Sequence, residues 1–180
     1  NTIYTLQNDV TSTGTCFTIT ADDVILDCQG YTINYSSAGT LGYGVYSNGK
    51  HYITVRNCNI KEGSATTSNK HAIYFNNIYE GIINNNTITT SGGSSGIEID
   101  YYSVYNTVSN NIITTSGSYG TGIVLTTVSY SNTVSNNIIT TSGSSGSGID
   151  LGSESNSNIV SNNIITTSTG KGIYLSGGST

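Results

Sequence analysis

Residues that could bind or act on a sugar recur at one place in a repeated sequence pattern. Two carboxylates and three tyrosines follow the first apolar residue of short strand-like runs, and a further carboxylate lies two positions on. Paired carboxylates can serve as acid and base in glycoside hydrolysis, and tyrosine rings offer faces for sugars or for a partner protein. The candidates for a glycan-binding face are Tyr46, Tyr74, Glu98, Asp100, Asp150 and Tyr174.

Catalysis is the less favoured interpretation of these residues. Glu98 and Asp150 lie two repeats apart, which separates their backbones by roughly 10 Å, and an inverting glycosidase needs carboxylates ~6.5–9.5 Å apart. The spacing therefore permits hydrolysis. However, we expect no Lys, Arg or His on the same face to bind an acidic sugar or act as a base, since His51 and His71 are expected in loops. We therefore expect that the protein is not an enzyme, and solvated carboxylates remain the alternative to a binding face.

Neither a metal nor a cofactor is expected. The densest acidic group is Asp22, Asp23 and Asp27. Such residues could hold Ca²⁺, but they more often form turns by hydrogen-bonding their own backbone. No paired set of metal ligands accompanies His51 or His71. We therefore assign none of these residues to a metal site.

The elements that position the candidates come from an internal repeat. The segment NTVSNNIITTSG at 106–117 returns unchanged at 132–143, and Val108, Val134 and Val160 stand 26 residues apart. Each repeat holds three short apolar runs without a helical pattern. This predicts an all-β fold, a parallel β-helix of about six turns with three short strands per turn. The single domain would span 1–180, with an entry strand in 1–15, repeated turns in 16–171 and a last open strand in 172–180.

A pair of asparagines follows the second strand of most repeats. We expect the first member to point inward, because stacked amides can hydrogen-bond along a column, and the second to occupy a left-handed turn. The column must be continuous, since a buried amide without a partner costs about 1–3 kcal/mol. The expected ladder consists of Asn57, Asn85, Asn110, Asn136 and Asn162.

The repeated pattern resembles that of a known family. GI-x-L followed about nine residues later by N-x-V-S-N-N-x-I resembles the right-handed parallel β-helix repeats of the pectate-lyase-like superfamily, over nearly the whole chain. The opening CFTIT–LDCQGYTI looks like the first turn of β-helix surface proteins from archaea and bacteria. The resemblance implies a right-handed coil outside the cytoplasm. It fixes no activity, because the superfamily holds lyases, hydrolases, phage tailspikes, adhesins and structural modules.

Composition narrows the partners and the location. The net charge is −5 with only five Lys and Arg residues, so no basic surface for nucleic acid can be assembled. No apolar run is long enough to span a bilayer. Three cysteines favour an oxidising, extracellular setting. Since the sequence starts at Asn1 without a signal-like segment, we expect a secreted protein whose signal has been removed.

The cysteines and sequons suggest covalent features. A Cys16–Cys28 disulfide would close the first turn, and a Cys28–Cys58 disulfide between adjacent layers is the alternative. Asn34, in Asn34-Tyr35-Ser36, is the candidate for glycosylation because it lies in a Ser/Gly-rich excursion. The sequon at Asn85 is discounted because that residue is expected to point inward.

A structural role is the leading functional expectation. Strand-like segments at both ends show no helical or charged cap, and bare β-helix ends pair with other chains. We expect head-to-tail self-assembly into a cell-surface filament or fibre, with a carbohydrate-binding or polysaccharide-degrading module and a stalk segment of a larger adhesin as alternatives. The end-to-end candidates are Ile3, Tyr4, Leu6, Ile173, Tyr174 and Leu175, and the lateral candidates are Ile112, Ile138 and Ile164.

Overall fold

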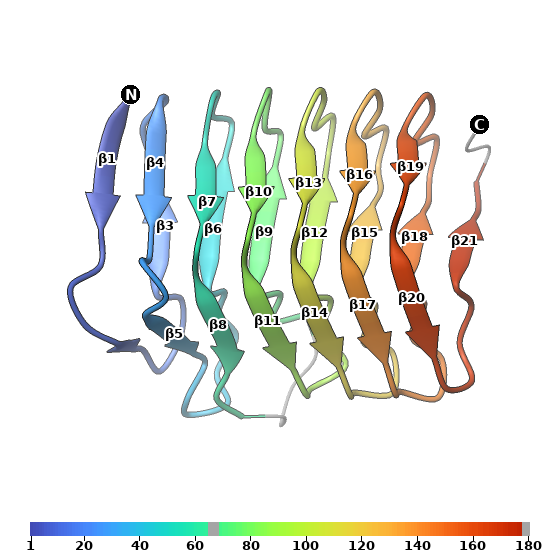
Figure 1. Ribbon diagram of the computed structural model, residues 1–180, viewed down its shortest axis with the longest axis horizontal. Helices are drawn as coiled ribbons and strands as arrows, with labels where there is room; N and C mark the ends of the chain where they lie inside the picture. Colours follow the sequence, from blue (N-terminus) through green and yellow to red (C-terminus); the bar gives the residue numbers. More distant parts are fainter. Residues whose placement is uncertain (65–68, 178–180) are drawn as a thin grey trace.

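The computed structural model describes residues 1–64 and 69–177, which form a parallel β-helix. The coils stack along the long axis of the molecule, with the first and last coils at opposite ends (Figure 1). Three seven-stranded sheets run along the column, and every strand pairing in them is parallel. Among the described residues, no helix has the length and apolar character needed to cross a bilayer.

Each coil gives one strand to each sheet, so the chain visits sheets A, B and C in turn. Sheet A consists of β1 (Thr2–Thr5), β4 (Val24–Asp27), β7 (Thr54–Arg56), β10 (Ile82–Asn84), β13 (Thr107–Ser109), β16 (Thr133–Ser135) and β19 (Ile159–Ser161). Sheet B consists of β2 (Val10–Thr11), β5 (Thr32–Tyr35), β8 (Asn59–Glu62), β11 (Thr87–Thr90), β14 (Ile112–Thr115), β17 (Ile138–Thr141) and β20 (Ile164–Thr167). Sheet C consists of β3 (Phe17–Ile19), β6 (Val45–Asn48), β9 (Ile73–Asn76), β12 (Ile97–Asp100), β15 (Ile123–Leu125), β18 (Ile149–Leu151) and β21 (Ile173–Leu175).

The column has about seven coils instead of the six expected. The difference lies in the entry segment 1–15, which was expected to supply a single strand. It holds β1 and β2, which pair with β4 and β5 and so begin a full first coil. At the other end, β21 pairs with β18 as expected, and residues 178–180 of the expected last strand lie outside the described residues.

Apolar side chains at alternate strand positions form the core. Val108, Ile113 and Ile123 have no exposed surface, and each pairs with an equivalent Val or Ile in the next coil. Between sheets B and C the chain passes very close to this core. A Cβ on Gly122 would lie 2.4 Å from Ile139 Cγ2 and 2.5 Å from Gly148 O, which explains the repeated Gly before the first apolar residue of sheet C strands.

The asparagine pair reverses the expected roles. The residues expected in the ladder have positive φ and lie at the bend between sheets A and B: Asn57, Asn85, Asn110, Asn136 and Asn162. The second member points inward instead, as Asn86, Asn111 and Asn137 are buried. The reason is steric, because the bend needs a left-handed residue directly after the strand. That residue takes the solvent side, which interrupts the strand alternation, and the next residue points inward.

The inward amides form a continuous ladder. Asn111 Nδ2 donates to Asn137 Oδ1 at 3.0 Å and to the carbonyl of Ile83 at 3.0 Å, and Asn111 Oδ1 accepts from the backbone and side-chain amides of Asn86. A second ladder, which the sequence analysis missed, stands two residues before the inward Val of sheet A. Its members are Asn106, Asn132 and Asn158.

The disulfide joins adjacent coils and does not close the first turn. Cys28 and Cys58 are bonded, with their Cα atoms 4.7 Å apart. They occupy equivalent positions after β4 and β7, where the column itself brings Cα atoms to the distance a disulfide needs. Cys16 is free and half-buried, and burial raises the pKa of its thiol. The favoured Cys16–Cys28 pairing is therefore wrong, and the alternative is formed.

Candidate functional site

The outward face of sheet C carries the expected column of candidates. The pairing of neighbouring strands aligns Tyr46 with Tyr74, Tyr74 with Glu98, and Asp150 with Tyr174. Val124 stands between Glu98 and Asp150. The alternation of the strands therefore predicted this column correctly, and it divides the face into a tyrosine-rich part and a part nearer the C-terminus.

A second column lies beside the first, and the sequence analysis missed it. It consists of the residues two positions before each strand of sheet C, aligned by backbone hydrogen bonds from one coil to the next. His71 lies between strands, as expected, but the expectation that no Lys, Arg or His shares this face was wrong. The available signal was the constant spacing to the first apolar residue of each strand. The column reads Tyr43, His71, Ser95, Thr121, Ser147 and Lys171.

Four rings from the two columns form one cluster. The Tyr43 centroid lies 5.4 Å from that of Tyr46 and 5.1 Å from that of Tyr74. The His71 imidazole stacks on Tyr43 with an interplanar angle of 8° and lies 5.5 Å from Tyr74. The three tyrosines are half-exposed, whereas His71 is buried. The result is an aromatic platform on one flat sheet face, open to solvent on its outer side.

Glu98 and His71 meet at the edge of this platform. Glu98 Oε2 lies 3.2 Å from His71 Nδ1, and the same nitrogen accepts a hydrogen bond from the backbone N–H of Ser95 at 3.2 Å. Because Nδ1 accepts, the proton of the neutral imidazole is on Nε2. A protonated Glu98 can donate to Nδ1, whereas an ionised Glu98 would face its lone pair.

The protonation states fit this geometry. Burial raises the pKa of Glu98 to about 7, and the negative charges of Asp100 and Asp150 add to the rise. Burial lowers the pKa of His71 to about 4, against the charge of Asp100, which raises it. Between pH 4 and pH 7 the pair is therefore a neutral carboxylic acid beside a neutral imidazole. Such an acid can donate a hydrogen bond, or a proton, to a ligand oxygen.

These shifts predict a pH-dependent effect of the Glu98→Gln substitution. The raised Glu98 pKa contributes stability that is complete below its ordinary value near 4.5 and is lost as the pH rises through about 7. The lowered His71 pKa contributes stability that is present above its ordinary value near 6.5 and is lost as the pH falls towards about 4. The two slopes oppose each other in the wild type. Without Glu98, only the contribution of His71 to the pH dependence of the unfolding free energy should remain.

The free energy of unfolding of Glu98→Gln, relative to wild type, should therefore rise by roughly 2–3 kcal/mol between pH 4.5 and pH 7. Urea unfolding at a series of pH values measures it. Glu154→Gln, at an exposed turn, is the control and should stay parallel to the wild type. Parallel curves for Glu98→Gln as well would contradict the assigned protonation states.

Asp100 completes the tyrosine-rich part of the face. The Tyr74 hydroxyl donates to Asp100 Oδ2 at 2.9 Å and accepts from Asn76 Nδ2 at 3.1 Å. Burial raises the pKa of Tyr74, and the contact with Asp100 contributes to the rise. The structure thus brings Tyr46, Tyr74, Glu98 and Asp100 together, as expected, and adds Tyr43, His71 and Asn76.

Asp150 and Tyr174 form a separate group with Lys171. The Lys171 ammonium lies 3.3 Å from the centroid of the Tyr174 ring. Burial raises the pKa of Asp150, and the positive charge of Lys171 opposes that rise. All three residues line an open cavity of 380 Å³ that also includes Thr121 and Ser147. Within residues 1–64 and 69–177, no group of three or more His, Cys, Asp or Glu side chains is placed to hold a metal ion.

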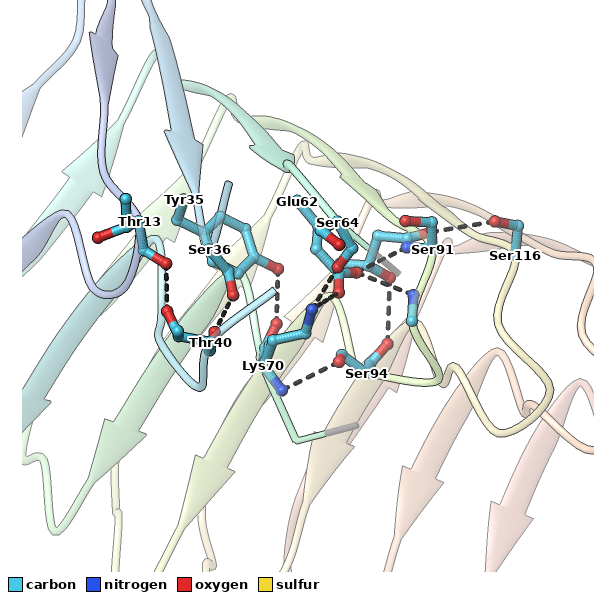
Figure 2. A network of polar contacts seen from close by, with 12 residues as sticks. Thr13, Tyr35, Ser36, Thr40, Glu62, Ser64, Lys70, Ser91, Ser94 and Ser116 are labelled. Atoms are coloured by element: carbon cyan, nitrogen blue, oxygen red, sulfur yellow. Dashed lines mark hydrogen bonds and ion pairs between the residues drawn. The ribbon is translucent and has the colours of Figure 1, made fainter. Parts of the chain in front are cut away.

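A second polar cluster is buried and faces no ligand (Figure 2). Lys70 Nζ lies 2.8 Å from Glu62 Oε1, and neither side chain has exposed surface. Glu62 Oε2 accepts from the backbone N–H groups of Ser91 at 2.7 Å and Gly92 at 3.0 Å. The Tyr35 hydroxyl donates to the Lys70 carbonyl at 2.6 Å. The ion pair ties β8 to the turn that follows it in the same coil, and the hydrogen bonds from Ser91 and Gly92 tie Glu62 to the next coil. We assign this cluster a structural role.

The remaining predicted site residues lie on other surfaces. Ile112, Ile138 and Ile164 align on the outer face of sheet B and are exposed, as alternation predicted. Asn34 is in β5, half-buried with its Oδ1 shielded, so it does not lie in a loop as expected. Asn85 is exposed, so the reason for discounting its sequon was wrong.

Exposure at the two ends differs among the end-to-end candidates. Leu6 and Tyr174 are half-buried. The others expose about half or more of their surface: Ile3, Tyr4, Ile173 and Leu175.

Comparison with known proteins gives one match. Residues 9–180 match a family model described as a right-handed β-helix region. No curated protein and no solved structure matches the chain. The match covers nearly the entire sequence and agrees with the parallel coil and the three sheets. The chain therefore belongs to the right-handed β-helix family.

Proposed function

We propose that the protein binds carbohydrate through the outward face of sheet C. The observation that supports this most is the platform of Tyr43, Tyr46 and Tyr74 with carboxyl groups at its edge. Half-exposed rings offer apolar faces for the C–H groups of a sugar and polar hydroxyls at their rims. Glu98 and Asp100 supply hydrogen-bonding groups within the same surface. Ligand sites of this kind combine an apolar lining with a few placed polar groups.

We further propose that the protein lies outside the cytoplasm and that it binds the glycan without cleaving it. The Cys28–Cys58 disulfide supports an oxidising location. A hydrolase needs a second carboxylate across the scissile bond from its acid. Asp100, whose charge acts on the acid Glu98, already accepts a hydrogen bond from the Tyr74 hydroxyl within the protein. We therefore propose a surface module that recognises a glycan and leaves it intact.

Substitution of the platform tyrosines tests this function. Tyr46→Ala and Tyr74→Ala should each weaken binding to the best ligand of a glycan array by about tenfold. Tyr119→Ala is the matched control, since this tyrosine is 74% exposed and lies outside sheet C. Incubation with the same glycan should release no shorter product. Binding that is unchanged in both platform variants would contradict the proposed site, and product release that depends on Glu98 would contradict binding without turnover.

A second candidate function, self-assembly, is favoured by the apolar surface of the first and last coils. Tyr4, Ile19 and Leu26 line an open cavity of 250 Å³ at one end, and Ile173 and Leu175 are exposed at the other. Another copy would cover both surfaces in a head-to-tail filament. Further coils of a longer chain would cover them equally well in a stalk of a larger adhesin. The exposed Ile112, Ile138 and Ile164 offer a lateral contact in either case.

Electron microscopy and light scattering on the 180-residue chain distinguish these candidates. Self-assembly predicts rods much longer than one molecule, which Ile173→Asp should shorten without unfolding the protein. Ile112→Asp should separate laterally associated rods and leave their length unchanged. Monomeric particles at high concentration would contradict self-assembly and would leave the glycan-binding proposal intact.

A further inference from the structure

We propose that the tyrosine platform binds the ammonium group of an amino sugar, between the Tyr74 ring and the carboxyl groups of Glu98 and Asp100. The inference rests on the carbohydrate-binding function proposed above and narrows it to one class of ligand. It is carried by a comparison of two equivalent places on the face of sheet C, one of which already holds an ammonium group.

The occupied place is at Tyr174. In register, Tyr174 neighbours Asp150 of the preceding coil. Lys171, from the adjacent column, places its ammonium 3.3 Å from the centroid of the Tyr174 ring, and its charge acts on Asp150. The face of Tyr174 thus holds a primary ammonium by cation–π attraction, and a carboxylate on the neighbouring coil adds a longer-range ionic attraction.

A tyrosine beside a carboxylate recurs at Tyr74 without a cation, with the carboxylate on the following coil and not on the preceding one. Tyr74 neighbours Glu98 of the following coil in register. The position equivalent to Lys171 is His71, whose imidazole is neutral above pH 4 and stacks on Tyr43. The Asp100 carboxylate accepts hydrogen bonds from the Tyr74 hydroxyl and the backbone N–H of Tyr101. Among the described residues, no Lys or Arg forms an ion pair with Glu98 or Asp100.

Electrostatics selects among sugar classes. Asp100 and Asp150 lie on this face of a chain with a net charge of −5, so their carboxylates would repel a uronic acid near the platform. A neutral sugar would gain ring contacts and hydrogen bonds but no ionic attraction. A protonated amino sugar gains all three, because its ring can lie on the tyrosines while its ammonium meets the carboxylates.

Binding should also release a proton. Glu98 faces His71, Asp100, Asp150, Tyr43 and Tyr74, and no group among them carries a positive charge near pH 6. An arriving ammonium favours the ionised carboxylate. Calorimetric heats of binding at pH 6 should therefore depend on the ionisation enthalpy of the buffer, which needs no variant and is unaffected by misfolding.

The test compares three oligosaccharides of equal length in calorimetry at pH 6: glucosamine oligomers, their N-acetylated counterparts and oligogalacturonate. We expect the glucosamine oligomer to bind the wild type at least about tenfold more tightly than the acetylated one, with a buffer-dependent heat. Oligogalacturonate should not bind. Glu98→Gln and Asp100→Asn should remove most of this preference. Glu154→Gln, which changes the net charge equally at a remote turn, should keep it.

Each other outcome overturns the inference in a distinguishable way. Suppose that the glucosamine oligomer and its N-acetylated counterpart bind with equal affinity and that Tyr74→Ala abolishes the binding of both. This result would refute the cation site and retain the glycan-binding function. If Glu154→Gln lost the preference for the glucosamine oligomer as fully as Glu98→Gln does, the preference would come from the net charge of the protein and not from a site. An oligolysine peptide that binds as tightly as the glucosamine oligomer would show that the site recognises ammonium groups without a sugar. Absence of binding by every oligosaccharide on a broad array would refute both proposals.

Discussion

Replacing Lys70 by methionine is expected to lower the free energy of unfolding by about 3–5 kcal/mol. The substitution keeps the length and apolar stem of the side chain but removes the ammonium 2.8 Å from Glu62 Oε1. The Glu62 carboxylate would then be buried without a cation, held only by the backbone N–H groups of Ser91 and Gly92. Chemical denaturation followed by circular dichroism measures the loss.

Two further variants separate the ion pair from general packing. Adding Glu62→Gln to Lys70→Met should recover part of the lost stability, because the amide oxygen can still accept from Ser91 and Gly92 and no buried charge remains. Lys61→Met, on the exposed side of the same strand β8, should change stability by less than about 0.5 kcal/mol. A double variant no more stable than Lys70→Met would show that charge burial is not the cause.

The second large effect is expected at the asparagine ladder. Asn111→Ala should destabilise the protein by roughly 3–5 kcal/mol, since each buried polar group left without a partner costs about 1–3 kcal/mol. The Ile83 carbonyl and the backbone N–H of Asn86 lose their hydrogen bonds to Asn111, and the Asn86 side-chain amide keeps only its bond to the Val55 carbonyl. The same denaturation experiment measures it, and hydrogen exchange at the Asn86 amide should accelerate.

Asn110→Gly is the matched control one residue away. Asn110 is exposed and has φ 57°, a conformation that glycine adopts without strain. We therefore expect a change of less than about 1 kcal/mol. A larger loss in Asn110→Gly than in Asn111→Ala would mean that the ladder is built from the first asparagine of each pair.

The fold could be predicted from the sequence because the strand periodicity and the repeat length are the same in most coils. Val108 and Ile113 recur with their neighbours at a fixed spacing, so the core columns and the outward columns of Tyr74 and Ile112 follow from alternation alone. The coil count differed because the short β1 and β2 precede the regular repeat. These strands pair with β4 and β5, but residues 1–15 do not contain the repeated sequence motif, so the sequence did not reveal the first coil.

Local geometry between strands was harder to predict than the strands themselves. Alternation fails at a bend, so it could not decide which of Asn110 and Asn111 turns inward. For the same reason His71, which precedes β9 by two residues, could not be assigned to the sheet C face. The favoured Cys16–Cys28 disulfide was wrong because the bends that follow β4 and β7 stack in adjacent coils, which brings Cys28 and Cys58 together.

The site itself depends on a contact between two columns. The outward carboxylates and tyrosines were visible in the sequence as one column, and they suggested only solvated or glycan-facing groups. The structure adds the neighbouring column, which places His71 against Glu98 and Lys171 over Tyr174. Burial on this face raises the pKa of Glu98, and the contact of Lys171 with Tyr174 supplies the comparison with the cation-free place at Tyr74.

The most direct test of the proposed glycan-binding face is amide chemical-shift mapping by NMR on the 18.8 kDa chain. The best glycan ligand would be titrated into the isotopically labelled protein. We predict that the largest shift changes fall on β6, β9 and β12 and on the residues just before them, including Tyr43, His71 and Ser95. Changes confined to sheet B or to the first or last coil, or the absence of any change, would contradict the assignment of function to sheet C.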